Sequence, residues 1–119
     1  MLTKELSEKY NDYIIDRRRY YHQYPELTLQ EIETTKSIIK DLKEIGIEDI
    51  KTFKDFHGCV GILKGGKPGK TVLLRADIDA LPVLEKTELP FASKIEGKMH
   101  ACGHDNHIAM LLGAAKILF

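Results

Sequence analysis

The sequence lacks an excess of charge of either sign, and this absence excludes whole classes of partner. Lysine plus arginine and aspartate plus glutamate each number 18, so the formal net charge at neutral pH is zero. Surfaces that bind nucleic acid or anionic membranes are typically strongly basic. We therefore expect neither a nucleic-acid partner nor a membrane partner.

Long apolar runs and cysteines are also scarce. No apolar stretch approaches the roughly 20 residues that cross a bilayer, and the first residues are charged where a signal peptide is apolar. We therefore expect a cytoplasmic protein whose two cysteines, Cys59 and Cys102, stay reduced. A chain of 119 residues with 43% hydrophobic and 30% charged residues predicts at most one globular domain.

Hydrophobic periodicity predicts two helices before residue 47. Apolar side chains recur at helical spacing from about Thr3 to Tyr21, and Pro25 prevents that helix from continuing. The three arginines at 17–19 fit either an anion site or the commoner solvent-facing basic turn at the end of a helix.

The second predicted helix has both start and stop signals. Thr28 is expected to be its N-cap, with Glu31 completing a capping box and Leu27 packing on Ile32 as a hydrophobic staple. Gly46 stands where a left-handed residue ends a helix. The stripe expected to face the core consists of Ile32, Thr35, Ile39 and Leu42.

After Gly46 the hydrophobic period changes to that of strands. Residues 47–53, 59–63 and 71–76 are predicted strands, and the glycine-rich segment 65–69 predicts a hairpin between the last two. This segment is weak evidence for a phosphate site, because it lacks a Lys-Ser/Thr continuation and a following helix. The order of helices and strands predicts an α/β fold.

Two carboxylates and an arginine end the third predicted strand. Side chains alternate along an extended chain, so Arg75, Asp77 and Asp79 are expected on one face, where open α/β sheets place ligands. Two interpretations stay open: a functional site, or an Arg-Asp ion pair that closes the strand end. The polar connection 83–98 is expected to run over the surface, and its length favours a function.

The stretch 99–107, Met-His-Ala-Cys-Gly-His-Asp-Asn-His, holds three imidazoles, a thiol and a carboxylate. A divalent transition metal requires such donors and a solvated loop does not. Cys102 and His104 can point the same way because Gly103 permits close approach. We therefore interpret the stretch as a metal loop, docked on a buried helix that begins near His107.

Neighbouring residues of this loop have alternative roles. Asp105 or the adjacent Asn is expected to cap the helix, unless Asp105 accepts the free ring N–H of a ligating histidine. His100 is either part of the metal site or a loop histidine without a role. His107 is expected to orient the site rather than to bind the metal. A closed zinc site that uses Cys59 is the less favoured alternative, because the spacing fits no zinc finger.

Three motifs occur in order over nearly the whole chain. They are 17–34, with Arg17-Arg18 and Pro25-Glu26-Leu27; 74–83, Leu-Arg-Ala-Asp-Ile-Asp-Ala-Leu-Pro-Val; and 99–107. Together they resemble the peptidase M20 amidohydrolases, in the branch of hippurate hydrolases, N-acyl-L-amino acid amidohydrolases, N-acetyldiaminopimelate deacetylase and plant auxin-conjugate hydrolases. Position 106 is Asn where that family usually has Gly.

The resemblance implies a three-layer α/β/α catalytic domain with two divalent ions, which are Zn, Mn, Co or Ni. It also implies hydrolysis of small N-acyl amino acids, such as hippurate or an N-acetyl amino acid. By matching motif positions, Cys102 and His104 are expected to be metal ligands, and Asp77 is expected to be an acidic residue of the catalytic site that lies behind the ligands, beside the metals. The residues expected to orient the site are Asp79, Asp105 and His107.

One absence departs from that family. Its general base is a glutamate of a downstream Glu-Glu pair, whereas this sequence has no glutamate after Cys102, and the family's lid domain is also missing. We hypothesise that residues 1–119 are the N-terminal part of such a catalytic domain, inactive alone. The alternative is a non-enzymatic module, which either binds one metal or pairs with a separate chain that supplies the rest. The predicted macromolecular partner is a homo-oligomeric copy or a missing C-terminal part.

Overall fold

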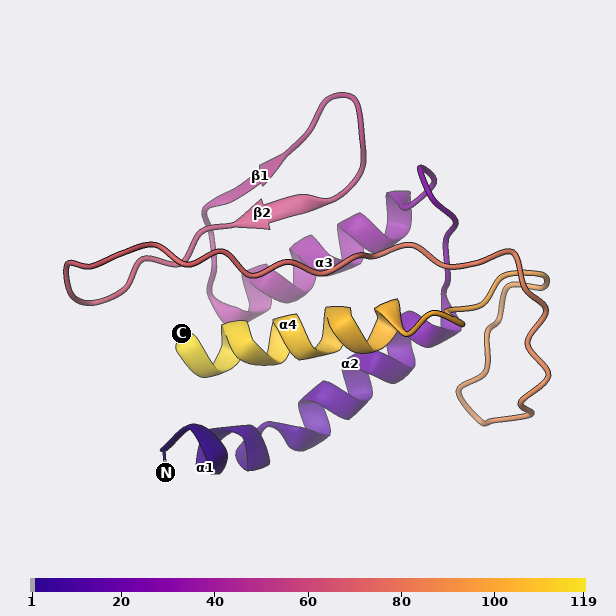
Figure 1. Ribbon diagram of the computed structural model, residues 1–119, viewed down its shortest axis with the longest axis horizontal. Helices are drawn as coiled ribbons and strands as arrows, with labels where there is room; N and C mark the ends of the chain where they lie inside the picture. The colour runs from indigo at the N-terminus through magenta and orange to yellow at the C-terminus, as the bar shows by residue number, and fades with distance from the viewer. Residues whose placement is uncertain (1) are drawn as a thin grey trace.

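The computed structural model describes residues 2–119 as four helices and one pair of short strands (Figure 1). Helix α4 packs along α2 and also contacts α1 and α3, so the helices form the body of the molecule. This mixture of helices and strands confirms the predicted α/β class. The elements are α1 Leu2–Lys9, α2 Asn11–Gln23, α3 Ile32–Ile45, β1 Ile50–Thr52, β2 Cys59–Gly61 and α4 His104–Leu118.

The core lies where α2, α3 and α4 meet. Tyr21, Ile108 and Leu112 are at most 3% exposed and form its centre, and Ile38 and Leu42 of α3 pack against them. Because each helix contributes its apolar side to one cluster, burial of these side chains holds the three helices together. The core therefore fixes the N-terminal end of α4 relative to α2.

The first predicted helix is broken in the structure. Tyr10, with φ −98° and ψ 10°, separates α1 from α2, and α2 continues to Gln23 rather than ending at Tyr21. Backbone bonds on both sides of Tyr10 persist, from its N–H to Leu6 O at 3.1 Å and from Ile14 N–H to its carbonyl at 3.0 Å. The helical stop before Pro25 is confirmed.

The predicted capping box of α3 is wrong. Helix α3 begins at Ile32, and the Thr28 hydroxyl donates to Asp79 Oδ2 at 2.6 Å instead of capping the helix. The Glu26 carboxylate performs the capping: it accepts the N–H of Thr34 at 2.5 Å and of Glu33 at 3.2 Å. A negative charge at a helix N-terminus also interacts favourably with the helix dipole.

Other predictions for α3 have mixed outcomes. Ile32 is 48% exposed, so the staple and the predicted stripe are wrong there, and Ile38 rather than Ile39 packs on the core. Gly46 is confirmed as the left-handed end of the helix, with φ 117°. Its N–H donates to Leu42 O at 3.2 Å and Lys43 O at 3.0 Å, which satisfies carbonyls of the last turn.

The strand pairing differs from the prediction. Strand β1 pairs antiparallel with β2, in the register Ile50 to Gly61 and Thr52 to Cys59, and the predicted hairpin of 59–63 with 71–76 does not form. Residues 71–76 are extended and carry no strand, with Val72 and Leu73 79% and 80% exposed. The apolar pattern predicts a segment that can pair with another strand. Within residues 2–119, however, no neighbouring strand forms backbone hydrogen bonds with residues 71–76.

The connection after residue 82 is anchored rather than fully solvated. An antiparallel bridge of Leu81 with Met99, with bonds of 2.9 and 3.0 Å, closes its base. Along it, Lys94 N–H donates to Gln23 O at 2.8 Å, which ties the connection to the end of α2. None of the helices within residues 2–119 is long and apolar enough to cross a membrane.

Candidate metal centre

His104 is the first residue of α4 and the best-placed donor of the predicted metal loop. Gly103 precedes it as the helix N-cap with φ 89°, a left-handed conformation that glycine adopts without strain. The His104 ring Nδ1 lies 3.0 Å from Asp79 Oδ1 and 2.9 Å from the Asp79 carbonyl. With Nδ1 bonded to these oxygens, Nε2 is the nitrogen left to bind a metal.

Asp79 is itself fixed. Its other carboxylate oxygen accepts the Thr28 hydroxyl at 2.6 Å. This hydrogen bond, outweighing partial burial, lowers the pKa of Asp79, and the nearby His104 lowers it further. An ionised Asp79 that accepts from His104 Nδ1 reproduces the carboxylate-histidine arrangement typical of metal sites, so these residues fit a metal at Nε2.

Asp77 lies on the other side of the His104 ring. Its Oδ2 is 4.0 Å from Nε2, too far for a hydrogen bond, while its Oδ1 accepts Arg75 Nη2 at 2.5 Å. The ion-pair interpretation of this segment is confirmed, and the functional interpretation stays a prediction. Arg75 and Asp77 form the ion pair, and Asp77 and Asp79 both face the imidazole of His104.

Cys102 is exposed on the turn before α4, and both cysteines are free thiols. Within residues 2–119, however, no three His, Cys, Asp or Glu side chains are grouped closely enough to hold a metal ion. Cys59 lies apart on β2, and burial raises the pKa of its thiol, which disfavours the thiolate that zinc requires. The donor types fit a divalent metal, but the described residues supply only part of its coordination.

Asp105 takes neither of its predicted roles. Helix α4 starts at His104 rather than near His107 and has no side-chain cap. The fully buried Asp105 carboxylate accepts Arg18 Nε at 2.9 Å and lies 2.8 Å from His22 Nδ1, so its hydrogen-bonded histidine is His22 rather than a proposed metal ligand. His107 is exposed, and its ring centre lies 5.8 Å from that of His104.

His100 is 3% exposed, and neither ring nitrogen has a hydrogen-bond partner. Burial lowers its pKa to about 4, so the ring is neutral near neutral pH.

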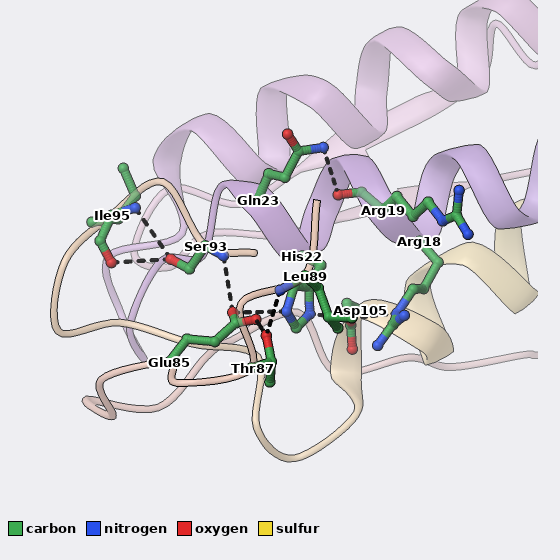
Figure 2. A network of polar contacts seen from close by, with 10 residues as sticks. All are labelled: Arg18, Arg19, His22, Gln23, Glu85, Thr87, Leu89, Ser93, Ile95 and Asp105. Atoms are coloured by element: carbon green, nitrogen blue, oxygen red, sulfur yellow. Dashed lines mark hydrogen bonds and ion pairs between the residues drawn. The ribbon is translucent and has the colours of Figure 1, made fainter. Parts of the chain in front are cut away.

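Sequence reasoning did not find His22, Glu85 or Thr28 near the site. His22 Nε2 lies 2.8 Å from Glu85 Oε1 (Figure 2). The contacts His22–Asp105, His22–Glu85 and Thr28–Asp79 join residues 83, 63 and 51 positions apart, so no local spacing in the sequence reveals them.

Comparisons with known proteins define the class of this protein. Residues 73–119 match the model of peptidase family M20/M25/M40. The chain is 52% identical over 107 residues to thermostable carboxypeptidase 1 of Saccharolobus solfataricus, an alignment that covers 90% of this chain and 27% of that protein. It is 49% identical to N-acetylcysteine deacetylase of Bacillus subtilis, over 88% of this chain and 28% of the deacetylase.

A solved structure agrees with the sequence relatives. A dinuclear metal-binding peptidase of the M20 family from Bacillus subtilis matches with a TM-score of 0.87 and 46% identity, over 93% of this chain and 31% of that one. The chain therefore belongs to the peptidase M20 family, a family of hydrolases, and its α/β fold is part of theirs. It spans 27% to 31% of the length of these three proteins.

Proposed function

We propose that this chain contributes half of the metal centre of an amidohydrolase that cleaves the amide bond of N-acyl amino acids. The observation that carries the proposal is the 3.0 Å contact of Asp79 with His104 Nδ1. It leaves His104 Nε2 free beside Asp77, and the exposed thiol of Cys102 lies two residues before His104. The substrate class is supported by relatives such as N-acetylcysteine deacetylase, whose name specifies an N-acetyl amino acid.

Each residue has a role in this proposal. Cys102 as thiolate and His104 through Nε2 bind the metal, and Asp79 holds the His104 ring in the tautomer that frees Nε2. Asp77 lies within 4.0 Å of Nε2 and adds negative charge beside the bound cation. Divalent ions at such a centre supply an acidified water and a Lewis acid for the scissile carbonyl. Zinc and manganese are the proposed ions.

The described residues do not supply every group that amide hydrolysis needs. Amide hydrolysis needs a base that takes the proton of the attacking water and passes it to the leaving amine. Among the described residues after Cys102, the carboxylate available is Asp105, and it is buried and bonded to Arg18. We therefore infer that residues 1–119 act as the N-terminal part of a larger catalytic domain and are inactive without the rest. The cytoplasmic location stays a prediction from the sequence.

Metal binding and turnover test the proposal separately. Titration of the purified chain with Co²⁺, followed by the thiolate-to-cobalt absorption band, is expected to give a band that Cys102→Ser abolishes. Cys59→Ser is the matched control and is expected to keep the band, because Cys59 lies on β2, apart from the loop. A band lost in both variants, or absent from the unmodified chain, contradicts the metal site.

Turnover is measured with hippurate and N-acetylcysteine in the presence of Zn²⁺ or Mn²⁺. The 119-residue chain is expected to show no hydrolysis above the metal alone. A chain extended to the full length of the M20 relatives is expected to hydrolyse an N-acyl amino acid and to lose this activity in His104→Ala. Clear turnover by residues 1–119 alone would contradict the inferred incompleteness.

A second candidate is a non-enzymatic module that pairs with another chain. Its support is the exposed apolar surface at Val72 and Leu73 in the extended segment and at Leu118 and Phe119, which are 64% to 80% exposed. Sedimentation with and without Zn²⁺ distinguishes the two. This candidate predicts association in solution, and a monomer at all concentrations argues against it.

A further inference from the structure

A buried cluster of charged groups lies behind the metal loop, and the proposed chemistry does not use it. We call Arg18, His22, Glu85 and Asp105 the His22 cluster (Figure 2). The His22 side chain is 2% exposed, with Nδ1 2.8 Å from Asp105 Oδ2 and Nε2 2.8 Å from Glu85 Oε1. Both ring nitrogens therefore face a carboxylate oxygen at hydrogen-bond distance.

Both carboxylates already serve as acceptors. Glu85 Oε1 accepts Ser93 N–H at 2.9 Å, and its Oε2 accepts the Thr87 hydroxyl. Burial tends to raise the pKa of Glu85, but these hydrogen bonds and the neighbouring His22 outweigh it and lower the pKa. Asp105 Oδ2 accepts Arg18 Nε at 2.9 Å, so this oxygen too is an acceptor.

A neutral imidazole cannot satisfy this arrangement while both carboxylates are ionised. It has one N–H donor and one nitrogen lone pair, so one of its nitrogens would direct a lone pair at a carboxylate oxygen 2.8 Å away. A doubly protonated ring donates to both. It also balances the cluster, with Arg18 and His22 positive and Glu85 and Asp105 negative, and buried charges persist when paired in this way.

The other groups around the ring do not change this balance. The Phe91 ring packs edge-on against His22, with centroids 5.7 Å apart, and excludes water from one side. His100 interacts electrostatically with His22 and Asp105, but its lowered pKa keeps it neutral near pH 7. The net charge of the groups that face His22 is therefore set by Arg18, Glu85 and Asp105.

The cluster joins three parts of the chain at one point. His22 comes from the last turn of α2, Glu85 from the connection after residue 82, and Asp105 from the first turn of α4, directly after His104. We propose that His22 is a doubly protonated positioning residue, which donates to Glu85 and Asp105 and thereby holds the first turn of α4 so that His104 faces the metal site. The positioning role rests on the proposed metal role of His104, whereas the protonation state does not.

The protonation state is tested by two-bond ¹H–¹⁵N correlation of the histidine rings at pH 7 without metal. The unmodified chain is expected to carry a proton on both His22 nitrogens. In the variant Glu85→Ala the acceptor beside Nε2 is removed and Asp105 remains as the one carboxylate on the ring, so Nε2 is expected to lose its proton while Nδ1 keeps one. An unprotonated nitrogen in the unmodified chain, or an unchanged ring in Glu85→Ala, overturns the assignment.

The positioning role is tested by Co²⁺ affinity from the thiolate absorption band. His22→Gln is expected to weaken binding about tenfold, the lower end of the range for residues behind metal ligands. His57→Gln is the matched control, since His57 lies in the loop between β1 and β2, and is expected to bind as the unmodified chain does. Both affinities are compared at temperatures where circular dichroism shows equal folded fractions.

The outcomes test the positioning role of His22 and the metal site separately. Equal Co²⁺ affinity in His22→Gln and His57→Gln overturns the positioning role while leaving the metal site in place. A missing band in the unmodified chain overturns the metal site and the positioning role together, and the NMR result then decides the protonation state by itself.

Discussion

Asp79 and His104 are 25 residues apart in the sequence, yet Asp79 Oδ1 lies 3.0 Å from His104 Nδ1. The contact joins the motif at 74–83 to the stretch 99–107. Asp79 is in turn bonded to Thr28, so a residue from each of the three motifs takes part in a single chain of contacts. The order Thr28, Asp79, His104 leads from the start of α3 to the proposed metal.

Asp79→Ala is expected to weaken Co²⁺ binding by about 10- to 100-fold, because the His104 ring loses the carboxylate that orients it. Asp79→Asn, which keeps an acceptor oxygen, is expected to weaken it less. The measurement is a titration followed by the thiolate band. Asp55→Ala removes an exposed carboxylate in the β1–β2 loop and serves as control. Equal affinities in Asp79→Ala and Asp55→Ala would show that Asp79 does not orient the ligand.

Glu26→Ala is expected to destabilise the protein by about 1–2 kcal/mol, since two N–H groups at the start of α3 lose a charged acceptor. Thr28→Ala removes a contact to a partly exposed carboxylate and is expected to cost less, about 0.5–1 kcal/mol. Urea unfolding at pH 7 gives both values. A smaller loss in Glu26→Ala than in Thr28→Ala would contradict the capping role of Glu26.

The two ends of α3 illustrate which parts of the fold the sequence predicts. The end of α3 at Gly46 follows from local backbone geometry, so the residue type alone predicts it. The start of α3 depends on a turn in which Leu29 adopts φ 66° and brings Glu26 back over the helix. Nothing in the spacing of Thr28 and Glu31 reports that turn, and the local capping signal was therefore misleading.

Strand pairing and the buried charges depend on contacts distant in sequence. The period-2 and apolar patterns predict segments 47–53, 59–63 and 71–76 equally, but pairing depends on which of them meet, and β1 with β2 is the pair that forms. In the site, the motif at 99–107 predicts donor residues because ligand types cluster locally. His22 is 83 positions from Asp105 and 63 positions from Glu85, so only the folded structure joins these residues.

Gly113→Ala tests the close approach of α4 to the N-terminal helices. A Cβ at Gly113 would lie 2.7 Å from Cδ1 and Cγ1 of Ile14, so Ile14 must move. Overpacking costs about 1–3 kcal/mol, while replacing glycine by alanine in a helix gains about 1 kcal/mol. We expect a net loss of about 1 kcal/mol in urea unfolding.

The sign of that effect should reverse when Ile14 is shortened. In an Ile14→Ala background the Cβ added by Gly113→Ala meets only the Cβ of residue 14, at 4.0 Å, which is an ordinary contact. Gly113→Ala is then expected to stabilise the protein by about 0.5–1 kcal/mol through helix propensity. A double-mutant cycle on the four proteins measures this coupling. The same loss in both backgrounds would mean that Ile14 does not limit the approach of α4.

Tyr21 and Asp41 give the protein a defined sensitivity to alkali. The Tyr21 hydroxyl donates to Asp41 Oδ2 at 2.5 Å, and both residues are at most 3% exposed. Burial, with the hydrogen bond and charge of Asp41 added, raises the pKa of Tyr21, and burial raises the pKa of Tyr13 to about 12. In the unfolded chain tyrosine ionises near pH 10. The folded state therefore holds these protons longer, and its stability should fall as the pH rises above 10.

Tyr21→Phe is expected to lower the free energy of unfolding at pH 7 by about 1–3 kcal/mol, because the buried Asp41 loses a donor and keeps only Arg17. The variant should also lose less stability than the unmodified protein between pH 10 and pH 11, by about 1 kcal/mol, since one buried phenol no longer ionises on unfolding. Tyr24→Phe, at an exposed tyrosine, is the control and should change neither value by more than about 0.5 kcal/mol. Urea unfolding at pH 7, 10 and 11 measures all three, and an alkaline loss in Tyr21→Phe equal to that of the unmodified protein would contradict the role of the Tyr21 proton.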